Sequence, residues 1–381
     1  MRIHPAVISE ADGLVTVSYR FETPSRPECS GELWFSLDAR FRDFISAGPE
    51  AAVAALVLPA MALGEDMDLA QPVSPRFHYG IRQYVAHFHL WLPQLLKKIA
   101  LRAPGTVRAA RPRAHAVVSC FSGGVDSFHT LYEHVDGGAA NQDYRLTHLF
   151  YAHGFDIPLG NPLYSEMAAE FALLGKSHGL GFIGVATNAR PLLDVHVPWV
   201  NTHGACLAAF AQFLSGGVGK FIIPSTNRHS LLFAPCGSNP VTDHMLGSET
   251  LEIVHHGSHV SRIQKILAIA DRREVQEHLR VCWQNVPDQR NCGRCVKCLR
   301  TMMPLALTGA LDQFTVFPLL PPWNLIDRKC FLPLDLSRYF PEQSYADELL
   351  ELAKTSGRRD AESSIEAGAG DPSGPQQKPA S

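Results

Sequence analysis

The residues best suited to chemistry form the stretch Ser122-Gly123-Gly124-Val125-Asp126-Ser127. An apolar run precedes this hexapeptide and an amphipathic pattern follows it, which predicts a strand, a tight glycine turn and the start of a helix. The N–H groups at a helix start have no internal partner, and the helix dipole favours negative charge there. Because glycines also let phosphate oxygens approach the backbone closely, we expect a phosphate site, with Ser122 and Ser127 adding hydroxyl donors.

This loop differs from the G-x-x-x-x-G-K-[ST] nucleotide loop, because no lysine follows its glycines and Asp126 lies inside it. A carboxylate repels a bare phosphate, so we expect Mg²⁺ to bridge Asp126 and the phosphates. Such an arrangement suits a pyrophosphate leaving group better than a transferred γ-phosphate. The alternative is a glycine-rich turn that only packs the helix on the strand.

Four cysteines give the second strong signal, and their spacing is C-x9-C-x2-C-x2-C. Four soft ligands suit a tetrahedral Zn²⁺, and Gly293 allows the tight turn that points thiolates at one centre. A closed four-cysteine site has no open position, so its expected role is structural. An iron–sulfur cluster remains an alternative, because cysteines hold such clusters too. The expected metal ligands are Cys282, Cys292, Cys295 and Cys298.

The hexapeptide resembles the PP-loop of the ATP pyrophosphatases, the adenine nucleotide alpha hydrolase group, which split ATP into AMP and pyrophosphate while adenylating a substrate. Together with the cysteine segment, residues 114 to 305 resemble 7-cyano-7-deazaguanine synthase (QueC) and its relatives. The resemblance matches Lys265 to a lysine that the family keeps before the zinc segment. We expect Lys265, together with Arg262 as a further ATP-binding residue, to neutralise charge on the phosphates. Two departures stand out: the N-terminal extension is larger than in QueC chains, and residues 255–259 do not map onto the family's substrate residues.

Strand and helix patterns alternate from about residue 112, which favours a doubly wound parallel sheet of the Rossmann-like PP-loop (HUP) type. We expect strands at 115–121, 146–152, 181–187, 219–224 and 251–255, and helices at 126–135, 163–178, 203–215, 260–270 and 273–280.

The sequence before this pattern predicts a β-rich appendage. Residues 1 to about 58 have the composition of strands and turns, and a helical periodicity then runs from Ile81 to Ile99, split at Pro93. The tail lacks the apolar content needed for order. We expect an N-terminal β-hairpin and helical appendage (1–110), a PP-loop domain with a zinc knuckle at 282–298 (111–310), a C-terminal extension (311–355) and a disordered tail (356–381).

Polar residues also follow the other predicted strands. Ligands of such sheets bind at the carboxyl ends of the strands, which makes four of these residues candidates for ATP binding. Arg190 and Arg228 could bind a substrate carboxylate or phosphates, or could form surface ion pairs. The additional candidate ATP-binding residues are His153, Asp156, Asn188 and Asn227.

The expected activity is substrate activation by adenylation. A carboxylate or amide oxygen of a small molecule or peptide attacks the α-phosphorus of ATP, and pyrophosphate departs. Ammonia or an amine then displaces AMP and gives an amide, or a nitrile after a second round. Asp126, Ser127 and Lys265 are the expected catalytic residues, acting by positioning and electrostatics.

Two other classes of protein stay open. A PP-loop sulfur transferase acting on tRNA or a small molecule would need a reactive thiol, for which Cys236 is the candidate. Otherwise Cys236 is a small buried residue. The third hypothesis is a non-catalytic nucleotide-binding protein that keeps the loop only for binding.

The composition of the chain indicates which kinds of partner it is expected to bind. The chain has 381 residues, of which 46% are hydrophobic, and a net charge of −3, so a sizeable core is expected and nothing global indicates nucleic-acid binding. No apolar stretch reaches the roughly 18 residues that span a bilayer, so we expect no membrane partner and a cytoplasmic location. The nine cysteines then predict reduced thiols or metal ligands. A homodimer would fit the resemblance.

Overall fold

The computed structural model describes residues 1–108, 116–136, 142–228, 235–318, 345–358, 361–362 and 365. The chain divides into two compact units. Unit 1 comprises Met1–Ser122, Thr130–Asn227 and Leu232–Ser258, and unit 2 comprises Gly123–His129, Arg228–Leu231 and His259–Ser381. His115, most of the expected C-terminal extension and nearly all of the expected tail (356–381) lie outside the described residues.

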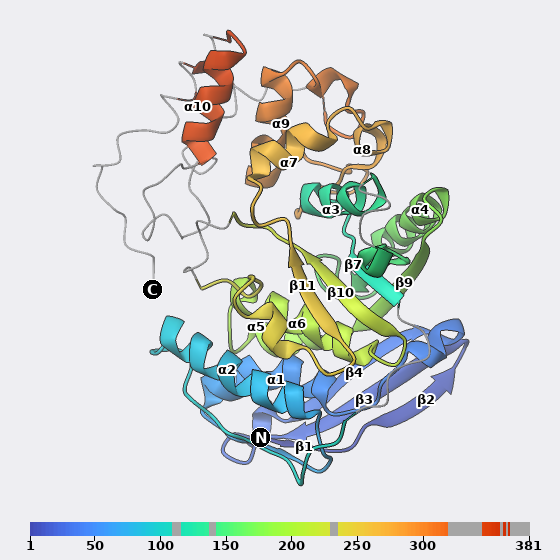
Figure 1. Ribbon diagram of the computed structural model, residues 1–381, viewed down its shortest axis with the longest axis vertical. Helices are drawn as coiled ribbons and strands as arrows, with labels where there is room; N and C mark the ends of the chain where they lie inside the picture. The colour runs from blue at the N-terminus through green and yellow to red at the C-terminus, as the bar shows by residue number, and fades with distance from the viewer. Residues whose placement is uncertain are drawn as a thin grey trace. The chain divides into compact units, whose positions relative to one another are not determined.

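Unit 1 is an α/β unit built on a mixed sheet of eleven strands (Figure 1). Five of its strands pair in parallel in the order β11-β10-β7-β8-β9, which confirms the alternating strand pattern of the sequence. Apolar β-branched and aromatic residues fill these strands, as expected for strands that are covered on both faces. They are β7 (Ala116–Cys120), β8 (His148–His153), β9 (Gly181–Thr187), β10 (Val218–Pro224) and β11 (Glu252–His256).

The N-terminal strands extend this same sheet. Strand β4 pairs antiparallel with β9, with Phe35 opposite Thr187, so the predicted hairpin is continuous with the parallel strands. The compact units accordingly place residues 1–122 together with most of the sheet, and the expected domain boundary at residue 110 stays a prediction. These strands are β1 (Arg2–Ile3), β2 (Val7–Ala11), β3 (Leu14–Glu22), β4 (Gly31–Asp38), β5 (Met67–Leu69) and β6 (Leu101–Arg102).

Helices cover both faces of the parallel strands. Successive side chains of β8 point to opposite faces: Phe150 contacts Phe210 of α6, whereas Tyr151 contacts Phe171 of α4. Helix α1 lies beside α6, and α2 lies beside α1 (Figure 1). The helices of this part of the chain are α1 (Glu50–Leu63), α2 (Pro75–Trp91), α3 (Val125–Asp136), α4 (Leu163–Ser177), α5 (Ala189–Asp194) and α6 (Trp199–Phe213).

Helix α1 corrects the expectation that residues 1 to about 58 form only strands and turns. Residues Ala51 to Met61 of α1 are all buried, so the helix has no polar face and no amphipathic period to detect. Pro59 inside the helix adds a misleading break signal. By contrast, α2 ends just before Pro93, as its sequence predicts.

Unit 2 is helical and has its own small core. Apolar residues of α7, α9 and α10 pack together, including Ile263, Met303 and Leu349. The helix expected near residues 345–354 is confirmed as α10. Besides the start of α3, its described residues include the helices α7 (Arg262–Ile269), α8 (Arg273–His278), α9 (Val296–Leu307) and α10 (Tyr345–Thr355).

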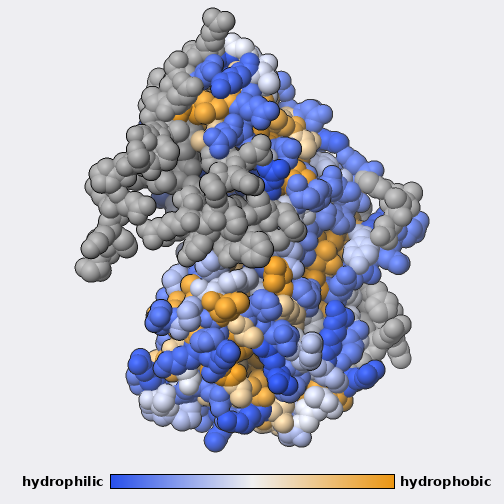
Figure 2. Space-filling model, turned by 60° about the vertical axis from the view of Figure 1, so that its left-hand side comes forward, coloured by the Kyte–Doolittle hydropathy of each residue, from blue (hydrophilic) through white to orange (hydrophobic). Residues whose placement is uncertain are grey.

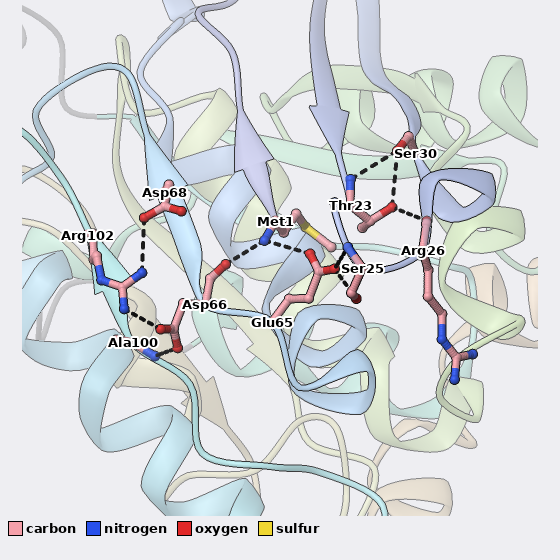
Figure 3. A network of polar contacts seen from close by, with 10 residues as sticks. All are labelled: Met1, Thr23, Ser25, Arg26, Ser30, Glu65, Asp66, Asp68, Ala100 and Arg102. Atoms are coloured by element: carbon pink, nitrogen blue, oxygen red, sulfur yellow. Dashed lines mark hydrogen bonds and ion pairs between the residues drawn. The ribbon is translucent and has the colours of Figure 1, made fainter.

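A buried polar network holds the start of the chain against the loop after α1 (Figure 3). The amino group of Met1 lies 2.7 Å from a carboxylate oxygen of Glu65, and the N–H of Ser25 donates to the other oxygen at 2.8 Å. Burial alone would raise the pKa of Glu65, but the hydrogen bonds from Met1 and Ser25 outweigh burial and lower it. The charged carboxylate therefore stabilises the fold.

Replacing Glu65 with glutamine should destabilise unit 1 by about 1–3 kcal/mol at pH 7, because the bonds to a charged acceptor are lost. A depressed carboxyl pKa gives stability that is present above the unfolded pKa of about 4.3 and is lost as the pH falls. The difference in melting temperature from the native chain should thus shrink below about pH 4. Glu28→Gln, at an exposed position, is the matched control. Equal melting temperatures at pH 7 would contradict this role.

Hydrophilic residues predominate on the face drawn in Figure 2, with apolar residues scattered among them. Within the described part of the chain, we find no helix with the length and apolar character needed to span a membrane.

Candidate functional site

The predicted phosphate loop enters unit 2 at Gly123, whose φ of +72° lies in the left-handed region that favours glycine. The hydroxyl of Ser127 and the N–H of Phe128 both donate to the carbonyl oxygen of Gly124, at 2.9 and 3.0 Å. The N–H of Arg280 donates to the carbonyl oxygen of Gly123 at 2.8 Å. Hydrogen bonds to the carbonyl oxygens of Gly123 and Gly124 therefore fix the turn into α3. The hydroxyl of Ser127 is engaged in one of these bonds, within the first turn of the helix.

Asp126 in this first turn is held by two cations. Arg262 Nη1 donates to one of its carboxylate oxygens and Lys265 Nζ to the other, each at 3.1 Å. The side chain of Lys265 is only 2% exposed, whereas those of Asp126 and Arg262 are 18% and 17% exposed. The structure thus brings together three of the residues singled out from the sequence, and one of them is almost fully removed from solvent.

The start of α7 positions both cations. Ser261 caps this helix: its hydroxyl accepts from the N–H of Gln264, and the Gln264 side chain accepts from the N–H of Ser261. Residues three apart on a helix lie on one face, so Arg262 and Lys265 point the same way. The capping box therefore fixes the helix start from which two positive charges reach one carboxylate.

Two cations, Arg262 and Lys265, face the carboxylate of Asp126. The sequence predicts Mg²⁺ here because Asp126 alone would repel a bare phosphate. The two cations offset that repulsion, which weakens this reason for a bridging ion. Magnesium binding stays a prediction.

The other predicted ATP contacts lie in unit 1. His153 ends β8, stacks on Tyr164 with ring centres 3.9 Å apart, and lies 3.3 Å through Nε2 from the carbonyl oxygen of Pro158. Burial lowers the pKa of His153, so the imidazole is neutral at pH 7. Asp156, in the loop after β8, lies 3.7 Å from Arg190. A role of His153 and Asp156 in ATP binding stays a prediction.

The amide of Asn188 is engaged by β4, because it accepts from the N–H of Trp34 at 3.0 Å and donates to the carbonyl oxygen of Glu32 at 2.8 Å. These bonds reinforce the junction of β4 with β9. The amide of Asn227 donates to Cys236 Sγ at 3.6 Å. A role of Asn188 and Asn227 in ATP binding stays a prediction. In the structure, the side-chain amide of each is already hydrogen-bonded within the protein.

The two arginines after the strands both form ion pairs. Arg190 lies 3.2 Å from Asp194 as well as near Asp156. Arg228 lies 3.1 Å from Glu348 of α10, within unit 2. Of the two readings that the sequence left open, these contacts favour the ion-pair one.

The four predicted metal ligands of unit 2 come together. Their sulfur atoms all lie within 4.8 Å of one another, although the residues span a segment that is largely irregular between α8 and α9. Individual separations are 3.4 Å (Cys295 to Cys298), 3.9 Å (Cys292 to Cys298) and 4.0 Å (Cys282 to Cys295). The side chain of Asn291 supports the segment by accepting from the N–H groups of residues 281 and 282. The cluster could hold a metal ion.

The spacing of these sulfurs fits one tetrahedral ion. Zinc–sulfur bonds of about 2.3 Å place the sulfurs of a tetrahedral site about 3.8 Å apart. An iron–sulfur cluster needs more room, because several irons and sulfides lie between the cysteine sulfurs. A hydrogen bond with Cys298 lowers the pKa of Cys295 to about 5, and the same contact raises the pKa of Cys298. Crowded thiols of this kind release protons readily when a cation binds.

Sequence reasoning missed His203 of α6, whose imidazole lies against the loop that carries Cys236 in unit 1: a Cβ atom added at Gly237 would lie 2.8 Å from Nδ1 of His203. The two residues are far apart in the sequence and follow no motif, so only the fold could pair them. The only local signal is weak: His203 is a titratable residue in a largely apolar helix, which also contains Asn201, Thr202 and Gln212. Nearby, His255 Nδ1 and a carboxylate oxygen of Asp243, both buried, lie 2.8 Å apart in hydrogen-bond contact.

Comparisons with protein-family models, with curated proteins and with solved structures each found no match.

Proposed function

We propose that this chain is an ATP-dependent adenylating ligase that forms AMP and pyrophosphate. The observation that carries the proposal is the placement of Arg262 and Lys265 on Asp126, in the first turn of α3. A helix start and two cations together make a strong site for a multiply charged anion. The PP-loop resemblance of the hexapeptide identifies that anion as the pyrophosphate part of ATP.

In this proposal the residues of unit 2 supply positioning and charge. Lys265 and Arg262 neutralise the charge that builds up as pyrophosphate leaves, and the N–H groups of the turn at Gly123 and Gly124 bind phosphate oxygens. Asp126 would hold Mg²⁺, which supplies further charge neutralisation when bound. The activated group is a carboxylate or amide oxygen, and ammonia or an amine completes an amide or nitrile, as the QueC-like resemblance implies.

The doubly wound PP-loop assignment of the sheet belongs to the same proposal. It is supported by the five parallel strands and by helices on both faces of β8. The hexapeptide follows β7, which is the central strand of those five. A loop after a central parallel strand is the usual place for a phosphate ligand in such folds.

We further propose that the four cysteines bind zinc and that the ion is structural. Four protein ligands leave no open position for a reacting molecule. The sulfur separations match a single ion better than a cluster of irons. The ion would cross-link a segment that has little regular structure between α8 and α9.

Binding and turnover of ATP test the proposal directly. Calorimetry should show binding of ATP with MgCl₂ to the native chain. ATP labelled at the α-phosphate should yield AMP when ammonium chloride and a panel of carboxylic acids are added. Asp126→Asn keeps the size of the side chain but removes its charge, and it should lower AMP formation about 10²- to 10³-fold. Asp271→Asn is the matched control, since Asp271 is 84% exposed.

The outcomes separate the hypotheses. ATP binding without AMP formation from any acid would indicate a non-catalytic nucleotide-binding protein. Formation of ADP in place of AMP, or full AMP formation by Asp126→Asn, would overturn the proposal.

A further inference from the structure

A second group of reactive side chains lies in unit 1, after the carboxyl end of β10. Cys236 is 7% exposed, and its sulfur accepts from the amide of Asn227 at 3.6 Å. The imidazole of His203, on α6, packs against the residue next to this thiol, because a Cβ atom added at Gly237 would lie 2.8 Å from Nδ1 of His203. A buried thiol with an amide donor on its sulfur and an imidazole beside it has surroundings typical of a reactive cysteine.

The backbone around this thiol is fixed by close packing. The N–H of Gly237 donates to the carbonyl oxygen of Val200 at 2.8 Å. A Cβ atom added at Gly204 would lie only 1.9 Å from the carbonyl oxygen of Gly237, so the loop and α6 touch through backbone atoms. The amide of Asn239 donates to the carbonyl oxygen of Cys236 at 3.0 Å. The loop that carries the thiol is thus packed closely against the helix that carries the imidazole.

The imidazole is oriented as well. Its Nδ1 lies 3.2 Å from the carbonyl oxygen of Trp199, one helical turn earlier. A carbonyl oxygen can only accept, so Nδ1 of His203 carries a hydrogen. A nucleophile beside a base that is oriented by a third group is the general pattern of an activated nucleophile.

The charges support a thiolate facing an imidazolium. Burial raises the pKa of Cys236, but the hydrogen bond from His203 and its charge outweigh burial and lower that pKa. Burial lowers the pKa of His203, but its contacts with Cys236 outweigh burial and raise it. Cys206 and Cys120, in apolar surroundings of the same unit, show the opposite: burial raises the pKa of both thiols.

The surroundings contain further titratable groups. Asp243 is buried and accepts from Ser238 Oγ at 2.7 Å, besides pairing with His255. The hydroxyl of Tyr84, on α2, is fully buried and has no hydrogen-bond partner among the described residues. Burial and then the nearby charges of Asp243, Cys206 and Cys236 raise the pKa of Tyr84. The hydroxyl of Tyr84 is thus a buried polar group close enough to Cys236 for their charges to interact.

We propose that Cys236 and His203 form a nucleophile–base pair that accepts acyl groups from activated carboxylic acid derivatives. Sulfur transfer would need a persulfide donor. Acyl transfer needs only a thiolate, a proton carrier and a donor for the carbonyl oxygen, and Cys236, His203 and Asn227 provide these three. Acyl adenylates belong to this class of substrate, and only that identification rests on the proposed function.

The chemical step balances within the pair. The sulfur of Cys236 attacks the acyl carbon, and a carbon–sulfur bond forms. The bond from that carbon to the leaving oxygen breaks, and the leaving group takes the electron pair and the proton of His203. An amine then attacks the thioester, passes its proton to His203 and displaces the thiolate. The pair returns to its starting state, and the product is an amide.

Two measurements on the full chain, without ATP, test the pair. Alkylation by iodoacetamide, followed by peptide mass spectrometry, should label Cys236 at pH 6.5 about tenfold faster than Cys29, because an ordinary thiol has a pKa of about 8.5. Reaction with p-nitrophenyl acetate should place an acetyl group on Cys236. His203→Gln should slow both reactions at Cys236 about tenfold and leave Cys29 unchanged.

The buried Cys206 is the internal control for folding, since it should stay unlabelled in every variant. If Cys206 becomes labelled in His203→Gln, that variant has lost its fold. The labelling rates and acetylation of Cys236 in the native chain then test the proposal alone. Labelling of Cys236 no faster than Cys29 in the native chain, or no acetyl group on it, would overturn the proposal. Because no ATP is present, this result is independent of whether the chain forms AMP.

Discussion

Exchange of Cys295 for serine should unfold unit 2 and release its metal. Binding of structural zinc by small cysteine sites contributes an apparent free energy of about 10–16 kcal/mol to folding at neutral pH. This is comparable to the whole free energy of unfolding of an ordinary domain. The rest of unit 2 offers only a small core between α7, α9 and α10. The segment from Cys282 to Cys298 has little regular structure before α9 begins at Val296. We therefore expect loss of the ion to exceed what that core can offset.

Elemental analysis of the purified chain should find one zinc per chain, and a strong chelator should reproduce the effect of the substitution. Hydrogen exchange should increase in α7, α9 and α10. The matched control is Cys29→Ser, because Cys29 lies outside the cluster. Iron with visible absorbance would identify the iron–sulfur alternative. A chain that contains no metal, with a melting temperature indifferent to chelator, would contradict a metal site.

Replacement of Lys265 by methionine should lower the rate of AMP formation about 10²- to 10³-fold. The methionine fills nearly the same buried space but removes the charge that would face the leaving pyrophosphate. Arg262 stays beside Asp126, so the carboxylate keeps one partner and the fold should survive. The loss should appear in kcat more than in KM, since the charge matters most as the phosphate bond breaks.

Lys354→Met is the control for this substitution, because Lys354 is 58% exposed and its contact with Glu362 is long, at 3.8 Å. Melting temperatures of both variants separate a chemical defect from a folding defect. An unchanged kcat in Lys265→Met, with the variant folded, would mean that this ammonium group serves the stability of α7 and not the reaction.

The sequence predicted the parallel half of the sheet well. Strands β7 to β11 and helices α3, α4 and α6 carry clear periodicities and turn signals. It failed at α1, since a helix buried on every side has no period to read. It also could not reveal that β4 pairs with β9, because antiparallel pairing between distant segments is decided by packing.

The candidate sites divide in the same way. The cysteine cluster is encoded locally by its spacing, and the structure brings all four sulfurs together. The contact of Asp126 with Lys265 joins residues that are 139 positions apart, and only the family resemblance suggested it. The pair of Cys236 and His203 had no such guide, because its members belong to a loop and to a helix interior. Tertiary pairing of this kind leaves no trace in a single sequence.

The edge strands of the sheet affect how readily the protein aggregates at high concentration. Strand β6, at one rim, has only two residues, one of them Arg102. Strand β11, at the other, is five residues long and includes Glu252 and two histidines. Short or charged border strands are poor templates for fibril growth. By occupying the side of β9 that would otherwise lie open, β4 gives the long hydrophobic strands the same protection against aggregation.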